Sequence, residues 1–134
     1  MATWAEFSAN LRASGSAKSF GDDNFWELTI PVNGGRSQTV RVSRWVQADG
    51  EWVRLDSPFT PYSPGVDVLK YLRAVAQMPC GGLEILSIGG DEALAVRHVV
   101  PLATMDNEDF FKPLVAVARV ADAMEHDVHG VDIF

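Results

Sequence analysis

The feature that most constrains this fold is a long amphipathic segment near the C-terminus, residues 106–128. Its apolar side chains recur at alternating spacings of four and three residues, the period of one face of an α-helix. A stripe of this width needs a large apolar surface to lie on, and strands earlier in the chain can supply one. The stripe consists of Phe110, Leu114, Val117, Ala121 and Met124, widened by Phe111, Val115 and Ala118.

The start of this helix carries two further signals. Thr104 or Asp106 is suited to cap it, because both side chains can accept a hydrogen bond from a free backbone N–H of the first turn. Pro113 lies inside the predicted helix, where proline removes a backbone donor and clashes with the preceding turn. We therefore expect a kink at Pro113, or a break after a first turn near Phe111.

A β-hairpin is predicted in the first half of the chain. Residues 25–32 alternate between apolar and polar side chains, and a glycine-rich turn leads to a return strand, residues 36–47. A two-residue loop would place apolar side chains opposite polar ones. A three-residue loop at 33–35 keeps the apolar faces matched and sets Glu27 opposite Arg41, so we prefer this register.

A second turn, Asp49-Gly50, extends the hairpin into a three-stranded meander that proline stops at Pro58. A two-residue loop at this turn places Trp45 opposite Arg54. The same register sets Trp45 diagonal to Trp52 on the next strand.

The remaining elements follow from capping and turn signals. Thr3 is suited to cap a short first helix, and the small polar residues 14–24 are predicted to form a loop. Ser63 is the expected cap of a second helix. A second hairpin is predicted over residues 83–88 and 92–102. The second helix is expected to turn inward Val68, Leu69, Leu72, Val75 and Ala76.

This order, α-βββ-α-ββ-α, predicts an α+β fold with one antiparallel sheet and helices packed on one face. The 134 residues fit a single domain, residues 1–134, and the hydrophobic content of 47% is sufficient for a core. The single cysteine, Cys80, excludes an internal disulfide and is typical of a reducing cytoplasm. We find no signal peptide and no apolar run of the ~20 residues that a membrane span needs. A cytoplasmic location is therefore expected.

Charge and motifs exclude several function classes. The formal net charge is −7, and the sequence has no basic patch of the kind that binds backbone phosphates. Nucleic acid and anionic membranes are therefore not expected as partners. The sequence contains no G-x-S-x-G elbow, phosphate-binding P-loop or G-x-G-x-x-G motif. We expect neither enzyme activity nor a cofactor.

Three small groups could carry chemistry, but each has a structural explanation that we favour. His126 and His129 lie three residues apart among acids and could hold a divalent ion, although an acidic helix end has the same pattern. Cys80 has no neighbour in the sequence that would activate its thiol. Asp22 and Asp23 precede a strand and are expected to be loop charges.

The outward face of the meander is the most suggestive feature. If the apolar residues of the meander face the helices, Phe25, Trp45 and Trp52 face the other way, among Glu27, Arg41, Arg54 and Asp56. Aromatic and arginine side chains are enriched in protein interfaces, so the three aromatic residues and the two arginines are candidate partner-binding residues. The alternative is a hairpin that is merely stabilised by its two tryptophans and a cation–π contact between Trp45 and Arg54.

His98 is the second candidate. It shares a strand face with apolar neighbours, so its side chain is expected to point inward. A histidine in that place is either a hydrogen-bonded residue of the core or of a cleft, which is the interpretation we favour, or a catalytic group.

The second half of the chain resembles a known family. The run GGLEILSIGGDEALAVRHVVPLATMDNEDFFKPLVAVARVADAMEHDV is similar to the hairpin, the proline and the final helix of YbjN-domain proteins, which have a type III secretion chaperone-like fold. This resemblance implies a twisted antiparallel sheet, a tendency to form homodimers, and a role in binding other proteins or in regulation. The first helix predicted here is shorter than in that family.

We therefore expect a non-enzymatic protein-binding module, chaperone-like or regulatory, that acts as a homodimer and binds a further protein partner. The alternative is a small-ligand sensor or minor enzyme with a cleft near His98. The two hypotheses differ in what should copurify with the chain, which is another polypeptide in the first case and a small molecule in the second.

Overall fold

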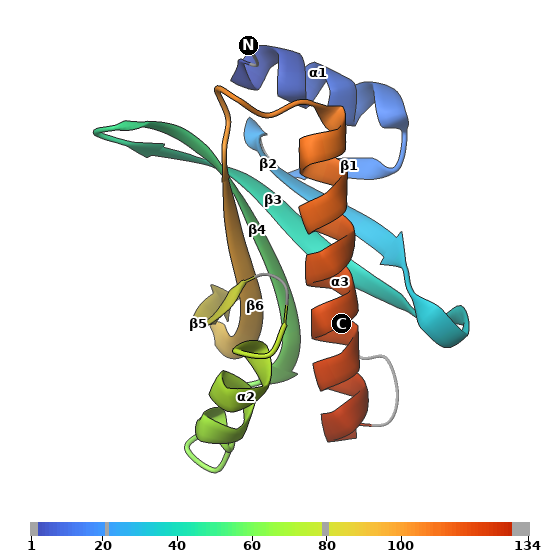
Figure 1. Ribbon diagram of the computed structural model, residues 1–134, viewed down its shortest axis with the longest axis vertical. Coiled ribbons are helices and arrows are strands. Elements are labelled where there is room, and N and C mark those ends of the chain that lie inside the picture. The colour runs from blue at the N-terminus through green and yellow to red at the C-terminus, as the bar shows by residue number, and fades with distance from the viewer. Residues whose placement is uncertain (1–2, 21, 79–80, 130–134) are drawn as a thin grey trace.

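The computed structural model describes residues 3–20, 22–78 and 81–129. These residues form a six-stranded antiparallel sheet, in the order β1-β2-β3-β4-β6-β5, and three helices (Figure 1). The fold is therefore α+β, as predicted. The helices are α1 (Trp4–Ser14), α2 (Val68–Val75) and α3 (Asn107–His129), and the strands are β1 (Ala17–Phe20), β2 (Asp22–Pro31), β3 (Ser37–Gln47), β4 (Gly50–Pro61), β5 (Gly82–Ile88) and β6 (Asp91–Pro101).

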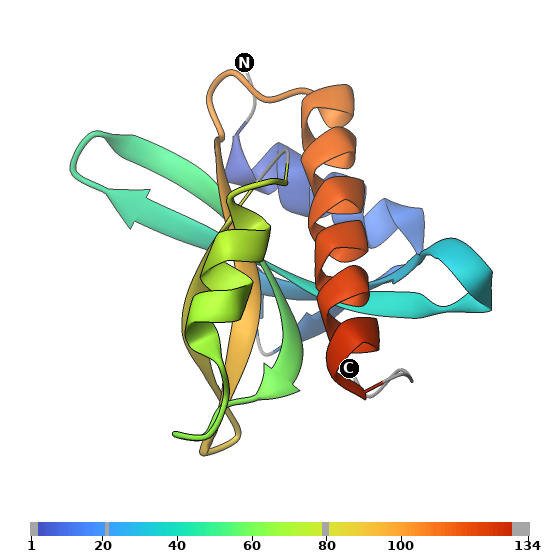
Figure 2. The ribbon, with the colours of Figure 1, turned by 60° about the horizontal axis from the view of Figure 1, so that its bottom comes forward.

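The helices pack on one face of the sheet, which we call the inner face. α3 crosses β3, β4 and β6, and its first turns meet α1 through Phe7 and Phe110, whose ring centroids lie 4.8 Å apart. α2 lies near the other end of α3, where Lys70 forms an ion pair with Asp127 at 2.6 Å. The β2–β3 and β3–β4 hairpins project past the helices at opposite ends of the molecule (Figure 2). Both projecting hairpins therefore leave part of the sheet uncovered.

The closing helix is confirmed, and its predicted line of apolar residues is buried. Asp106 is its cap: the Asp106 carboxylate accepts a hydrogen bond from the backbone N–H of Asp109 at 2.8 Å, and the Asp109 carboxylate accepts one from the backbone N–H of Asp106 at 3.1 Å. α3 continues through Pro113, so the predicted break after the first turn is wrong. Proline is tolerated there because the packing of the whole helix outweighs the loss of one backbone hydrogen bond.

The apolar stripe of α3 is narrower than predicted. Ala118 is buried as expected, but Phe111 is 64% exposed and Val115 is only half-buried. Successive helical residues are rotated by about 100°, so a helix on a sheet buries only the side chains that point directly at it. Phe111 therefore contributes to the surface of α3 and not to the core.

The first hairpin has the predicted register. Glu27 lies opposite Arg41 and Trp26 lies opposite Val42, and a short 3₁₀ turn, Asn33–Gly35, makes the three-residue connection. The hairpin β5–β6 is also present around the glycine turn between these two strands. Local alternation was sufficient to predict both hairpins because a register shift by one residue would turn every apolar side chain to the wrong face.

The predicted loop over residues 14–24 is wrong. Residues 17–20 form β1, an edge strand in which Ala17 lies opposite Leu28 and Lys18 opposite Glu27. So short a strand gives a weak alternation signal, but the open edge of β2 supplies backbone partners for its residues. The element order is therefore α-ββββ-α-ββ-α.

The second turn is also displaced from its predicted position. Gln47 lies opposite Gly50, so the loop residues are Ala48 and Asp49, and Trp45 lies opposite Trp52 instead of Arg54. The shift of two residues keeps every side chain on its predicted face. The observed register is favoured because it sets two fully buried apolar residues, Val42 and Leu55, opposite each other and allows a salt bridge between Arg44 and Glu51.

The second helix is shorter and rotated relative to the prediction. Its cap is Asp67, which accepts a hydrogen bond from the backbone N–H of Lys70 at 3.1 Å, and Ser63 lies before the helix. Tyr71 and Val75 are the buried side chains of α2. Tyr71 packs on Phe59 with ring centroids 5.1 Å apart, and this contact sets the rotation of the helix. Of the predicted inward residues, Leu69 and Leu72 are exposed, as is Ala76, whereas Val68 is partly buried.

Candidate functional site

The five predicted partner-binding residues share the sheet face opposite the core. Alternation along β2, β3 and β4 places all five on this outer face, since their strand neighbours Trp26, Val42 and Val53 are buried in the core. Each of the five is partly exposed. The residues that the structure brings together here are Phe25, Arg41, Trp45, Trp52 and Arg54.

Arginines lie over the aromatic rings of this face. The guanidinium carbon of Arg41 is 4.5 Å from the ring centroid of Phe25. Trp45 has two such neighbours, Arg54 at 5.7 Å and Arg97 at 4.8 Å. The predicted cation–π contact between Trp45 and Arg54 is therefore present, and each contact of this kind contributes about 0.5–1 kcal/mol at an exposed site.

Two carboxyl groups lie beneath the arginines. Asp56 is 3% exposed, and its Oδ1 is 3.5 Å from Arg54 Nε. Glu84 pairs with Arg54 and lies 3.8 Å from Arg97 Nε. Burial, together with a hydrogen bond to Glu84, raises the pKa of Asp56 to about 8, although Arg54 and Arg41 act in the opposite direction. Asp56 therefore carries a proton at neutral pH.

Sequence analysis missed two members of this group, Glu84 and Arg97. They come from the second hairpin, which joins the meander through the pairing of β6 with β4, where Asp56 lies opposite Arg97. Alternation in β5 and β6 could have placed both side chains on an outward face, but only the long-range strand order brings them to Asp56. We call the combined group the outer cluster; it consists of Phe25, Arg41, Trp45, Trp52, Arg54, Asp56, Glu84 and Arg97.

The floor of the outer cluster contains polar atoms that are buried but lack hydrogen bonds. Among the described residues, no hydrogen-bond partner exists for Arg41 Nη1, Arg54 Nε, Asp56 Oδ1 or Glu84 Oε1. A buried polar group without a partner costs about 1–3 kcal/mol. Arg54 Nε and Asp56 Oδ1 face each other at 3.5 Å, so Arg41 Nη1 is the donor of this set that a bound acceptor would complement.

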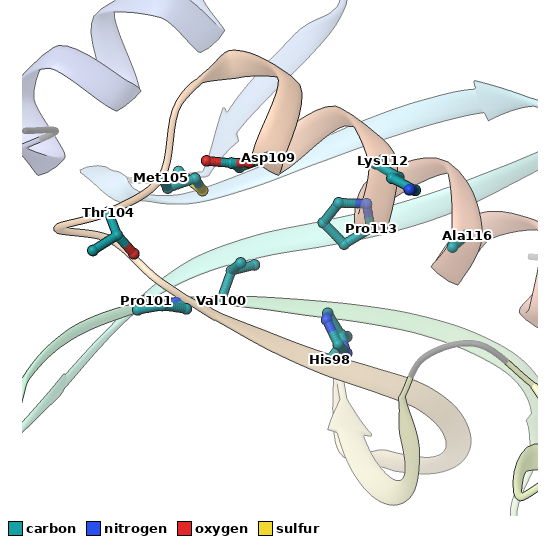
Figure 3. Close-up of a pocket in the computed structure, with 9 residues that line it drawn as sticks. All are labelled: His98, Val100, Pro101, Thr104, Met105, Asp109, Lys112, Pro113 and Ala116. Atoms are coloured by element: carbon teal, nitrogen blue, oxygen red, sulfur yellow. The ribbon is translucent and has the colours of Figure 1, made fainter.

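His98 lies in a cleft between β6 and the first half of α3 (Figure 3). The cleft has a volume of about 480 Å³ and mostly apolar walls. Burial lowers the pKa of the His98 imidazole, so the ring is neutral at pH 7. Asp109 is already used in the helix cap, which leaves His98, Thr104 and Lys112 as the polar groups of the wall.

Among the other candidate residues, those whose side chains the structure describes do not form a site. Asp23 pairs with Arg12, and the side chains of Asp22 and His129 and the whole of Cys80 lie outside the described residues. No three His, Cys, Asp or Glu side chains within the described part of the chain are close enough to hold a metal ion. None of the helices described is long and apolar enough to cross a membrane.

The described residues thus form an α+β fold, with a six-stranded antiparallel sheet and three helices, and present two candidate sites. These sites are the outer cluster and the His98 cleft. What they can do has to be argued from the residues themselves, because no family model, no curated protein and no solved structure matches this chain.

Proposed function

We propose that this chain is a non-enzymatic protein-binding module that works in the cytoplasm, in a chaperone-like or regulatory role. The observation that carries the proposal is the outer cluster, a partly exposed group of three aromatic rings and three arginines on the outer sheet face. Tryptophan and arginine are the side chains most enriched among residues that dominate binding energy in interfaces. A chaperone-like or regulatory role is what the resemblance to YbjN-domain proteins noted in the sequence would imply.

A protein partner fits this surface better than nucleic acid does. The arginines of the outer cluster are interleaved with Glu84 and Asp56, and the whole protein has a net charge of −7. A phosphate backbone needs a continuous basic surface, which this pattern does not provide.

The proposal is tested by capture of the natural partner with Trp45→Ala. The control is Val46→Ala, because Val46 is the next residue of the same strand, is 60% exposed and points away from the outer cluster. We expect Trp45→Ala to lose the partner that wild type and Val46→Ala retain, with circular dichroism showing that both variants fold. Equal retention of the partner by all three proteins would contradict the proposal.

We also propose that the chain forms a homodimer. The exposed side of α3 offers apolar surface for a second copy: Phe111, Val115 and Ala116 line a shallow depression of about 820 Å³. Sedimentation equilibrium of wild type and Phe111→Ser tests this, with Val46→Ser as the matched control. A two-chain mass for wild type and Val46→Ser but a one-chain mass for Phe111→Ser is expected. A dimer that persists in Phe111→Ser would place the interface elsewhere, and a monomeric wild type would exclude the dimer.

The His98 cleft favours a second function, that of a small-ligand sensor or minor enzyme. Its volume of about 480 Å³ is within the range of small-molecule sites, and apolar walls with a few polar groups are typical of them. Native mass spectrometry of the protein purified from its own host would show a single chain with a few hundred daltons of extra mass if this function holds. A mass of bare chains would contradict it.

A further inference from the structure

Arg41 differs from the other arginines of the outer cluster. Arg54 and Arg97 each lie within ion-pair distance of Glu84. Glu27 is directly opposite Arg41 in the strand register, yet within the described residues no carboxylate oxygen lies within 4.0 Å of an Arg41 guanidinium nitrogen. The charge pair with Glu27 that the register predicted is therefore not formed. Asp56 lies opposite Arg41 on the other neighbouring strand and feels its charge, but it too lies beyond ion-pair distance of the Arg41 guanidinium.

The surroundings of the Arg41 guanidinium show that it lacks a hydrogen-bond acceptor. It lies over the ring of Phe25 at 4.5 Å, which holds its plane in place, and its Nη1 is buried with no hydrogen-bond acceptor among the described residues. Arginine has a flexible stem, so the guanidinium can turn outward at low cost when an acceptor is offered. A carboxylate is the acceptor that matches its fork of N–H groups, through two parallel hydrogen bonds.

The charge around Arg41 also favours an anion. Three guanidinium groups lie in the outer cluster, and the carboxyl groups of Glu27 and Glu84 lie among them. The third carboxyl group, Asp56, holds its proton at neutral pH because its pKa is about 8. The outer face is therefore locally positive although the protein as a whole has a net charge of −7.

We propose that the outer cluster binds an acidic segment of a partner protein, one carboxylate of which pairs with Arg41. This proposal rests on the proposed protein-binding function and names the chemistry of the partner. A peptide is favoured over a free carboxylate because the Phe25 and Trp45 rings lie beside the arginines and offer contact area to the neighbouring side chains of a segment.

The experiment is a titration of the ¹⁵N-labelled full chain with an acetylated, amidated hexaglutamate peptide, followed by NMR at the Arg41 Nε–H and the Trp45 indole N–H. The probes for comparison are hexaglutamine and free glutamate. Arg41→Gln removes the charge, and Arg41→Lys keeps the charge without the fork. The matched control is Arg44→Gln, because Arg44 lies on the same strand and is already paired with Glu51 at 2.6 Å.

We expect saturable shifts with hexaglutamate only, with a Kd that rises with salt. The Kd should be at least about tenfold higher in Arg41→Gln, a few-fold higher in Arg41→Lys and nearly unchanged in Arg44→Gln, since a hydrogen-bonded charge pair is worth about 1.5–3 kcal/mol. No saturable binding, equal binding of free glutamate, or an equal effect of Arg41→Gln and Arg44→Gln would overturn the proposal. If Trp45→Ala loses the natural partner while Arg41→Gln retains it, the carboxylate assignment fails and the protein-binding function stands.

Discussion

Replacement of Asp56 by asparagine should change how the stability of this protein depends on pH. Asp56 is buried against Glu84, and its pKa in the folded chain is about 8, compared with 3.8 for an ordinary aspartate. Between these two values the folded protein holds one more proton than the unfolded chain. Unfolding therefore releases a proton, so a rise in pH favours the unfolded state, and the stability that Asp56 contributes is lost as the pH approaches 8.

The size of this effect follows from the linkage relation. One extra proton in the folded state changes the free energy of unfolding by about 1.4 kcal/mol for each pH unit. From pH 5 to pH 7 Asp56 should therefore lower the stability of wild type by about 3 kcal/mol. The substituted asparagine has no proton to release, and its amide can still donate to Glu84, so Asp56→Asn should lack this loss. For a domain of this size the difference corresponds to roughly 10 °C in Tm.

Urea unfolding of wild type and Asp56→Asn at pH 5, 6 and 7 measures this difference directly. His98 contributes a trend of opposite sign, because its pKa is lowered by burial and protonation in acid therefore favours the unfolded state. Both proteins contain His98, so its contribution cancels in their difference. Glu92→Gln, which removes an exposed carboxylate of β6, is the control and should follow wild type. If the free energy of unfolding changed with pH by the same amount in wild type and Asp56→Asn, the reasoning would be refuted, because Asp56 would then be ionised in the folded protein.

Two further predictions concern the core and a buried ion pair. Leu114→Ala should lower the free energy of unfolding by about 2–5 kcal/mol in urea, because Leu114 is 2% exposed. Leu69→Ala, the same change at a residue that is 55% exposed, should cost less than about 0.5 kcal/mol, and equal losses would contradict the burial described. Arg36→Met should cost about 3 kcal/mol, because Arg36 Nε and Nη2 both donate to the buried Asp122 carboxylate. If the loss is caused by leaving the Asp122 carboxylate buried and unpaired, adding Asp122→Asn to the Arg36→Met variant should restore much of the stability. No restoration would exclude this cause.

Local sequence patterns were sufficient to predict the elements whose periodicity, caps and turns lie within a few residues of one another. The period of the closing segment predicted α3, and Asp106 was one of two residues expected to cap it. The alternation on either side of residues 33–35 predicted the register that sets Glu27 opposite Arg41. In both cases a wrong assignment would expose several apolar side chains at once, so the sequence admits few alternatives.

Local sequence patterns gave wrong predictions where a contact with a distant element decides the structure of a segment. The rotation of α2 is set by the packing of Tyr71 on Phe59, which left Leu69 and Leu72 in solvent. The short strand β1 exists because the edge of β2 offers it backbone hydrogen bonds. Its own side chains give too weak a signal to predict it.

For the candidate site, the sequence by itself determined which side chains leave the core. Alternation set Phe25, Trp45 and Trp52 on the outer face, and it held even though the second turn was displaced by two residues. Only the tertiary structure decided what lies beside them. The pairing of β4 with β6 brought Arg97 to Asp56, because strand order depends on contacts between residues far apart in the chain that no local pattern encodes.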